Sequence, residues 1–324
     1  MKLKSEELPA VSVIVIGRNE AQNLPVTIQS IRLMNYPQDR LEVIYVDTDS
    51  TDGSAGVARS LGLKVYEEHS DFPSAAKARN RGWREAKYDI VHFVDGDMVV
   101  DPFYLEQAVK HLEQDHVACV IGQLWERHAS NNIIAHILDY SWKVKELGSV
   151  NAPGAGGTFI KSILQEIGGY NSDLLRGEET ELGFRLRELG YRILMIDHIM
   201  GTHDYGIHSV RGLCVRFYRI GHNFANVLLL PPSASLAAER RSAQRSAIEG
   251  IFAVFIFVGL ACFRLWHIFP VLPILLASYV LARYWQPARL RYLRISYFML
   301  DYFFKPVVWF GMAKKLFTQW ILRR

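Results

Sequence analysis

The apolar positions of the first hundred residues follow two periods, one typical of buried strands and one typical of amphipathic helices. Val11 to Ile16 is a continuous β-branched run, which predicts a strand buried on both faces of a parallel sheet. Leu24, Ile28 and Ile31 then recur at helical spacing. The same patterns predict further strands at 41–46, 64–66 and 90–94, a short helix ending near 58, and a helix at 74–86.

Strands and helices that alternate at this rhythm imply right-handed crossovers. They predict an α/β fold with a doubly wound, mostly parallel, Rossmann-like sheet, in a catalytic domain that spans residues 1–230. Farther along, the pattern is looser, with a glycine-rich stretch at 154–158, a helix near 179–189 and a strand at 192–196. Ligands on such sheets gather at the carboxyl ends of the strands, and the acidic clusters at 47–52 and 95–97 both fall at such ends.

The composition changes after Pro231 and Pro232, and residues 231–324 are predicted to be a membrane-associated helical region. Between 248 and 281 the acidic, basic and histidine side chains are only Glu249, Arg264 and His267. We interpret this stretch as a helical hairpin at about 248–284; the alternative is an apolar bundle packed on a soluble domain. A segment at about 295–312 is predicted to be an interfacial or re-entrant helix, and a cationic tail follows it.

Net charge and cysteine content narrow the class of partner. The formal charge of +4 arises from 37 Lys and Arg against 33 Asp and Glu, and the basic excess lies near the C-terminus. This placement favours membrane lipids over nucleic acid as the partner. The three cysteines show no CxxC pairing, and the first ten residues lack the apolar region of a signal peptide. We therefore expect a catalytic domain that faces the cytoplasm, at the cytoplasmic membrane.

The strongest candidate for chemistry is Asp95-Gly96-Asp97 at the end of an apolar strand. Two carboxylates separated by one residue can hold Mg²⁺ or Mn²⁺ against a diphosphate, because these cations prefer oxygen ligands and bridging phosphates. A pair of this kind is also common as a solvated turn, so it does not establish a metal site alone.

Three further elements are weak individually. The loop from Asp47 to Ser54 could bind a base and ribose, or merely cap the next helix. Lys77 and Arg79 could donate to phosphates, or lie on a solvated face. The acids that open the helix at Gly177 could complement the helix dipole, although a base that deprotonates an acceptor hydroxyl must also come from a separate segment.

Taken together and in this order, the elements resemble the family 2 glycosyltransferases with a GT-A fold, over about residues 10 to 225. The motifs that carry the resemblance are Val11-Ser12-Val13-Ile14-Val15 with Asn19-Glu20, Val46-Asp47 through Asp52-Gly53-Ser54, Ala78-Arg79-Asn80, Phe93-Val94-Asp95-Gly96-Asp97, Gly168-Gly169-Tyr170, and Gly177-Glu178-Glu179-Thr180-Glu181-Leu182.

The resemblance implies a metal-dependent, inverting transfer in which each motif has a role. Glu179 would be the catalytic base, and Mg²⁺ or Mn²⁺ would be bound by Asp97 with His203 as a further ligand. The donor, with a UDP-sugar favoured, would contact Arg18, Asn19, Glu20, Asp47, Lys77, Arg79, Asp95 and Glu178. Two positions depart from the family pattern, Thr48 after Asp47 and Glu179 where aspartate is common, so Glu178 or Glu181 could exchange roles with Glu179.

The predicted acceptor is a lipid-linked or saccharide hydroxyl in the synthesis of envelope polysaccharide or glycolipid, because membrane attachment favours an acceptor delivered there. Two alternatives remain open at this point. One is a nucleotidyltransferase that makes sugar nucleotides, although the turn at 17–20 lacks its glycine-rich phosphate loop. The other is a non-catalytic membrane scaffold.

Overall fold

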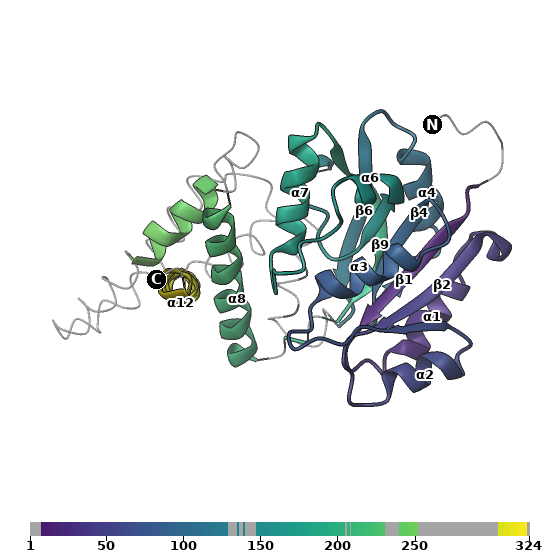
Figure 1. Ribbon diagram of the computed structural model, residues 1–324, viewed down its shortest axis with the longest axis horizontal. Helices are drawn as coiled ribbons and strands as arrows, with labels where there is room; N and C mark the ends of the chain where they lie inside the picture. Colours follow the sequence, from purple (N-terminus) through teal and green to yellow (C-terminus); the bar gives the residue numbers. More distant parts are fainter. Residues whose placement is uncertain are drawn as a thin grey trace, which may run out of the picture. The chain divides into compact units, whose positions relative to one another are not determined.

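The strands between Val11 and His203 form one curled sheet, seen in the computed structural model of Figure 1. The structure describes residues 8–128, 135, 139, 147–204, 206–207, 209–230, 240–251 and 304–322. Within these residues nine strands form a sheet in the order β3-β2-β1-β4-β8-β6-β9-β5, and β7 pairs with β9. The strands are β1 (Val11–Gly17), β2 (Leu41–Asp47), β3 (Lys64–Glu67), β4 (Ile90–Asp95), β5 (Val99–Val100), β6 (Val117–Glu126), β7 (Gly148–Val150), β8 (Gly157–Ile160) and β9 (Arg192–His203).

The sheet is mixed rather than mostly parallel. Strands β3, β2, β1 and β4 are parallel neighbours, as the sequence predicts. Strand β8 is antiparallel to both β4 and β6, β6 is parallel to β9, and β5 and β7 are antiparallel to β9. The chain enters β8 from the turn at 154–156 instead of from a crossover helix, so the parallel arrangement does not extend there.

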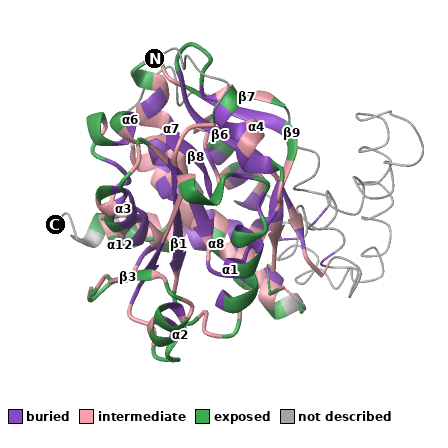
Figure 2. Cartoon of the chain, turned by 90° about the vertical axis from the view of Figure 1, so that its right-hand side faces the viewer, coloured by how far each residue is buried: buried purple, intermediate pink, exposed green. Residues whose placement is uncertain are grey.

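Helices cover both faces of the sheet, which explains the continuous apolar run in β1. Ile14 and Ile16 belong to a core cluster with residues of α3, α6 and α7, whereas Val13 and Val15 point to the other side and are equally buried. Figure 2 shows β1 among buried segments, whereas α2 mixes buried, intermediate and exposed residues. The helices of this unit are α1 (Leu24–Arg32), α2 (Ser54–Ser60), α3 (Ala75–Glu85), α4 (Tyr104–His111), α6 (Lys161–Glu166) and α7 (Glu178–Glu188), with a 3₁₀ turn at Gln38–Arg40.

Helix α3 lies unusually close to the sheet because it carries Gly82. A Cβ atom at this position would stand 2.2 Å from Cγ2 of Ile14 in β1, so no larger residue fits without a shift. Ser74 caps the start of α3 by accepting a hydrogen bond from the backbone N–H of Lys77. These two contacts fix the register of α3 and carry its Arg79 to the edge of the sheet.

The chain divides into two units, Met1–Arg127 with Lys145–Asp204, and His128–Val144 with Tyr205–Arg324. The second unit therefore includes α8 (Val210–Leu229), although the sequence assigns residues up to 230 to the catalytic domain. Helix α8 packs on α12 (Lys305–Leu322) through the buried side chains Leu213, Phe217, Phe304, Val308 and Met312.

Two glycines allow the backbones of α8 and α12 to meet. A Cβ on Gly221 would lie 2.0 Å from the carbonyl oxygen of Val308, and one on Gly311 would lie 2.2 Å from that of Tyr218. Both neighbours are backbone atoms, which cannot move aside as a flexible side chain can. The crossing of these helices therefore depends on glycine at both positions.

Most of the predicted membrane region falls outside the described residues. Of the hairpin at 248–284, only 248–251 is described, within a helix at 240–251. The interfacial segment expected at 295–312 overlaps α12, which begins at Lys305 and continues to Leu322 through the predicted cationic tail. Among the helices described here, none is long and apolar enough to cross a bilayer.

Candidate active site

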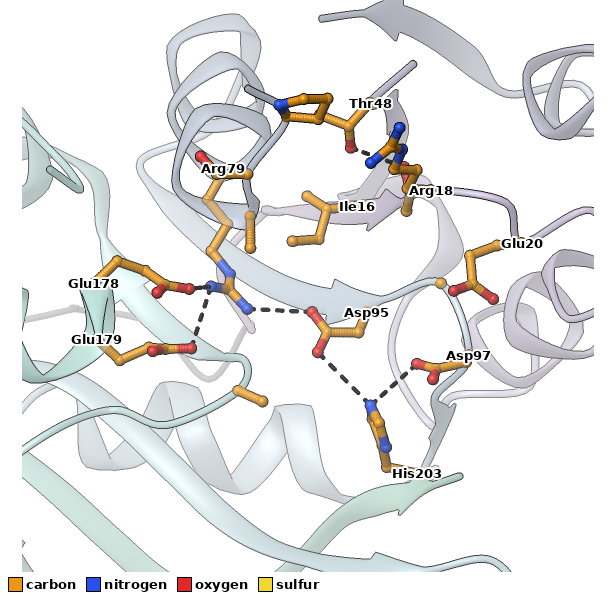
Figure 3. Close-up of a pocket in the computed structure, with 16 residues that line it drawn as sticks. Ile16, Arg18, Glu20, Thr48, Arg79, Asp95, Asp97, Glu178, Glu179 and His203 are labelled. Atoms are coloured by element: carbon orange, nitrogen blue, oxygen red, sulfur yellow. Dashed lines mark hydrogen bonds and ion pairs between the residues drawn. The ribbon is translucent and has the colours of Figure 1, made fainter. Parts of the chain in front are cut away.

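A cavity of about 380 Å³ lies at the carboxyl ends of β1 and β4. It brings together the turn after β1, the start of α3, the loop after β4, the start of α7 and the end of β9 (Figure 3). The residues that line it are Ile16, Gly17, Arg18, Glu20, Thr48, Pro73, Ser74, Ala75, Arg79, Asp95, Gly96, Asp97, Ala155, Glu178, Glu179 and His203.

The loop Asp95-Gly96-Asp97 is held by its backbone, which leaves its carboxylates free to face the cavity. The N–H of Gly96 donates to the carbonyl of Ile16 at 2.8 Å, and the Thr27 hydroxyl donates to the carbonyl of Gly96 at 2.8 Å. A Cβ on Gly96 would lie 2.8 Å from Cγ of Glu20, so glycine is required between the two acids. The guanidinium of Arg127 donates to the carbonyl of Asp97.

His203, the last residue of β9, lies between the two carboxylates of this loop (Figure 3). Its Nε2 is 3.2 Å from Oδ1 of Asp97 and 3.9 Å from Oδ2 of Asp95. Burial lowers the pKa of His203, but the hydrogen bond to Asp97 and the charges of Asp97 and Asp95 outweigh it, so the pKa is raised. The backbone N–H of Arg127 donates to the carbonyl of His203 at 3.0 Å, so Arg127 joins the two segments that carry the candidate metal ligands.

Arg79 is the charged centre of the cavity wall, with a side chain only 2% exposed. Its Nη2 is 3.2 Å from Asp95, and its Nη1 is 3.2 Å from Glu178 and 3.4 Å from Glu179. The guanidinium also lies over the ring of Tyr170, 5.4 Å from its centroid. Burial alone would lower the pKa of Arg79, but the neighbouring carboxylates raise it, so the side chain is a permanent cation.

Glu178 and Glu179 reach the cavity from the first turn of α7, which begins after Gly177 in a left-handed conformation (φ 80°). Acidic groups at this end also complement the helix dipole. Burial, and next the charge of Glu179, raise the pKa of Glu178 well above its ordinary value despite Arg79. Glu179 is the more exposed of the two, at 24% against 9%.

Glu181, the third acid of this turn, is engaged elsewhere. Its carboxylate accepts two hydrogen bonds from Arg185, at 2.7 and 2.8 Å, and it does not line the cavity. Arg185 also donates to the carbonyls of Ile167 and Gly169, which ties α7 to the preceding turn. The alternative in which Glu181 takes the role of Glu179 therefore has no geometric support.

The predicted donor residues separate into two groups. Arg18 and Glu20 line the cavity with Arg79, Asp95 and Glu178, and burial raises the pKa of Glu20 although Asn23 donates to it at 2.7 Å.

The structure does not place Asn19, Asp47 and Lys77 on the cavity wall. The side-chain oxygen of Asn19, a residue with φ 60°, accepts from the N–H of Thr51 at 2.8 Å. Buried Asp47 accepts from the N–H of Ser50 at 2.9 Å and from the hydroxyl of Tyr45 at 3.2 Å. Lys77 donates to the carbonyl of Phe72 at 3.1 Å and to the hydroxyl of Ser70. Their contacts organise the loops that surround the cavity.

Ser74, Ala155 and Arg127 are among the residues at or beside the site that were not predicted from the sequence. Ser74 lines the cavity at the start of α3, and a serine before an alanine-rich helix is a recognisable capping signal. Ala155 lines it from the glycine-rich stretch at 154–158, which the sequence predicts to shape the acceptor side without singling out this residue. Arg127 carried no local signal, because its importance arises from the pairing of β6 with β9.

Comparisons with known proteins found both similar sequences and similar structures. Residues 12–163 match the family described as "Glycosyl transferase family 2". The chain is 26% identical over 232 residues to "Glycosyltransferase AglE" of Haloferax volcanii, covering 69% of this chain and 75% of that protein. It is 26% identical over 213 residues to "Probable glycosyltransferase YdaM" of Bacillus subtilis, and 25% identical over 204 residues to "Poly-beta-1,6-N-acetyl-D-glucosamine synthase" of Staphylococcus aureus.

The matches to the Bacillus subtilis and Staphylococcus aureus relatives each cover 58% of this chain. They cover only 49% and 48% of those two proteins, so the chain spans about half of their length. Among solved structures, "Mannosyltransferase PcManGT from Pyrobaculum calidifontis in complex with GDP-Man and Mn2+" superposes with a TM-score of 0.66 at 20% identity, covering 97% of this chain and 91% of that one. This similarity establishes that the two chains share a fold.

Proposed function

We propose that this chain, a glycosyltransferase with a family 2 domain at residues 12–163, transfers a sugar from a nucleotide-sugar donor to a lipid-linked or saccharide acceptor with inversion at the anomeric carbon. The observation that carries the proposal is a single cavity lined by Asp95, Asp97 and Glu179, which come from two separate segments of the chain. Arg79 lies between the two sets of acids (Figure 3), so the cavity has an acidic group at each end.

The residues around Asp97 fit a divalent cation. Nε2 of His203 lies within 3.9 Å of carboxylate oxygens of both Asp95 and Asp97, so the three side chains converge on one point of the cavity. No trio of metal-ligating side chains in the described residues forms a complete site by itself. Mg²⁺ and Mn²⁺ in nucleotide enzymes commonly take one or two carboxylates, and substrate phosphates and water complete the shell. Asp97 with His203 would hold the ion, which when bound would neutralise charge on the departing diphosphate.

Glu179 is the residue best placed to remove the acceptor proton. In an inverting displacement the acceptor hydroxyl approaches from the side opposite the leaving group, and the base must be there. Glu179 lines the cavity on the side of Arg79 that is away from Asp97, and it is more exposed than Glu178. Glu178 is almost buried against Arg79, which leaves Glu179 as the acid with the more accessible carboxylate.

The donor would occupy the side of the cavity formed by Arg18, Glu20 and Thr48. A UDP-sugar remains the favoured donor from the sequence. PcManGT, which shares the fold, is described with GDP-Man, so a GDP-sugar is the second donor to test. The hydroxyl of Thr48 donates to the carbonyl of Gly17 at 2.9 Å, so this departure from the family pattern has a structural role beside the cavity.

The reaction would take place at the cytoplasmic face of the membrane, in the synthesis of envelope polysaccharide or glycolipid. The support is the apolar, nearly uncharged sequence of 248–284 and the basic residues on its flanks. The Staphylococcus aureus relative is named as a polysaccharide synthase, which agrees with this class of product. No observation favours the nucleotidyltransferase or the scaffold alternative.

The test is release of nucleoside diphosphate and transfer of radiolabelled sugar to extracted lipid by the purified chain. The assay uses UDP- and GDP-sugars with Mn²⁺. Glu179→Gln should lower turnover by about 10²-fold or more, because general-base catalysis typically contributes 10²–10⁴-fold. Glu188→Gln, at the exposed end of the same helix, is the matched control and should keep full turnover. Normal turnover in Glu179→Gln would show that another group is the base.

A further inference from the structure

Helix α12 presents large apolar side chains on two opposite sides. On one side Phe304, just before the helix, stacks on Phe217 of α8 with ring centroids 4.8 Å apart, and Val308 and Met312 are buried. On the other side Phe310, Phe317 and Trp320 remain exposed. Helix α8 therefore covers one side of α12, and the side chains on the other side keep more than half of their surface exposed.

The exposed side chains form a continuous stripe. Phe317 lies seven residues after Phe310, and Trp320 follows three residues later, so the three directions fall within about 80° at 3.6 residues per turn. Their exposed fractions are 57%, 60% and 51%. We call these three residues the aromatic ridge. A single exposed aromatic needs no explanation, but an aligned set indicates a surface that contacts a partner.

The charge around the aromatic ridge identifies the class of partner. From Lys305 to Leu322 the helix contains no acidic residue, and Lys314 is exposed beside the ridge. A second copy of this chain would oppose lysine to lysine across a two-fold contact, which is unfavourable. An anionic lipid surface instead offers phosphates to the lysines and an apolar layer to the rings. Trp, Phe and Lys together are typical of helices that lie in the membrane interface.

We propose that α12 lies in the plane of an anionic lipid surface, with Phe310, Phe317 and Trp320 inserted at the boundary between head groups and acyl chains. The inference rests on the proposed membrane attachment and deepens it, since it names the helix, the side chains and the lipid charge. It differs from a spanning segment: one side of α12 stays packed on α8 while the other contacts lipid.

The experiment follows a fluorescent label next to the ridge in the full-length chain. The three native cysteines are replaced by alanine, and Thr318→Cys is labelled with the environment-sensitive dye NBD. Thr318 is exposed, and its hydroxyl donates to the carbonyl of Lys314 within the same helix. Ser60→Cys is the matched control, because Ser60 is exposed on α2 and bonds in the same way to Val57. The probes are phosphatidylcholine vesicles with and without phosphatidylglycerol.

We expect NBD emission at position 318 to shift to the blue and rise with vesicles that contain phosphatidylglycerol, and emission at position 60 to stay unchanged. The triple variant Phe310→Ser, Phe317→Ser, Trp320→Ser should abolish the shift. Lys314→Gln should weaken it by about fivefold in lipid titrations, the contribution typical of one lysine near an anionic surface.

Three results would overturn the inference. They are no change at position 318, an equal change with neutral vesicles, and a change without vesicles that grows with protein concentration, which would indicate self-association. Nucleoside diphosphate release by the same labelled chain in detergent tests the proposed enzyme separately. If the enzyme is active but NBD emission at position 318 does not change with vesicles, only the role of α12 is refuted. If the emission changes but the chain is inactive, only the proposed transferase activity is refuted.

Discussion

The residues around the cavity of the first unit and the helix pair of the second unit are both closely packed, but different interactions hold them in place. Around Arg79, three carboxylates share one buried cation, so the arrangement depends on charge. At the crossing of α8 and α12, Gly221 and Gly311 let the backbones meet, so the arrangement depends on the absence of side chains. Substitutions that alter charge should therefore act on the first unit, and substitutions that add volume on the second.

The largest effect is expected where charge serves catalysis. Asp97→Asn keeps the shape of the side chain but removes the charge that would hold the divalent ion, so turnover should fall by about 10³-fold, consistent with several kcal/mol of stabilisation by a metal. Nucleoside diphosphate release measures the loss, and circular dichroism should show an unchanged fold. Asp115→Asn, at an exposed position, is the control. Full turnover in Asp97→Asn would remove this residue from the metal site.

The second largest effect is expected on folding stability, when the cation shared by the three carboxylates is removed. Arg79→Met leaves Asp95, Glu178 and Glu179 without their buried partner, and breaking a buried ion pair from one side costs about 3–5 kcal/mol. Urea unfolding should show this decrease in the free energy of unfolding. Arg59 pairs with Glu67 at the surface, where both side chains are well exposed, so Arg59→Met should cost less than about 1 kcal/mol. Equal losses in the two variants would contradict the comparison.

A smaller effect comes from a buried group in the same unit that has no charged partner. His92 on β4 is fully buried; its Nδ1 lies 3.1 Å from the Thr158 hydroxyl, and its Nε2 has no hydrogen-bond partner among the described residues. Burial lowers the pKa of His92 to about 4, from 6.5. Between these two values the unfolded chain binds a proton that the folded chain does not, so stability falls as the pH falls through this window.

At pH 4, His92 should lower the free energy of unfolding by about 3 kcal/mol. This value follows from about 1.36 kcal/mol per unit of difference between the pKa values of the folded and unfolded chain. The effect is absent above pH 6.5, where both states are neutral. His92→Leu should remove this part of the pH dependence in denaturant unfolding measured from pH 7 to 4. An unchanged pH profile in the variant would assign the acid sensitivity to other groups.

The sequence predicted the parts of the first unit that depend on local pattern. Strands β1, β2 and β4 and helix α3 appeared where the apolar periods placed them, because their residues face a core on one or both sides. The place of β8 between β4 and β6 was not predicted, since an antiparallel insertion of four residues leaves no periodic signal.

The site shows the same division between local and long-range information. Asp95, Asp97 and Glu179 were identified from motifs, and they do line one cavity. The contacts of Arg79 with both sets of acids, and of Arg127 with Asp97 and His203, depend on pairing between distant segments. The side chains of Asn19 and Asp47 hold loops beside the cavity, because nearby backbone N–H groups bind to them, and their contact with the donor stays a prediction.

The smallest effect tests the second unit alone. Gly311→Ala adds one methyl group that would meet the carbonyl of Tyr218 at 2.2 Å, so α8 and α12 must separate, at about 1–3 kcal/mol. In Gly212→Ala, on α8, the nearest atom to the new methyl is 3.4 Å away, and alanine should stabilise the helix by up to about 1 kcal/mol. The midpoint temperature of thermal unfolding should thus fall in Gly311→Ala and rise in Gly212→Ala, although the two substitutions are chemically identical. If both were stabilising, helix propensity would outweigh the close crossing, and the second unit would not depend on the absence of side chains there.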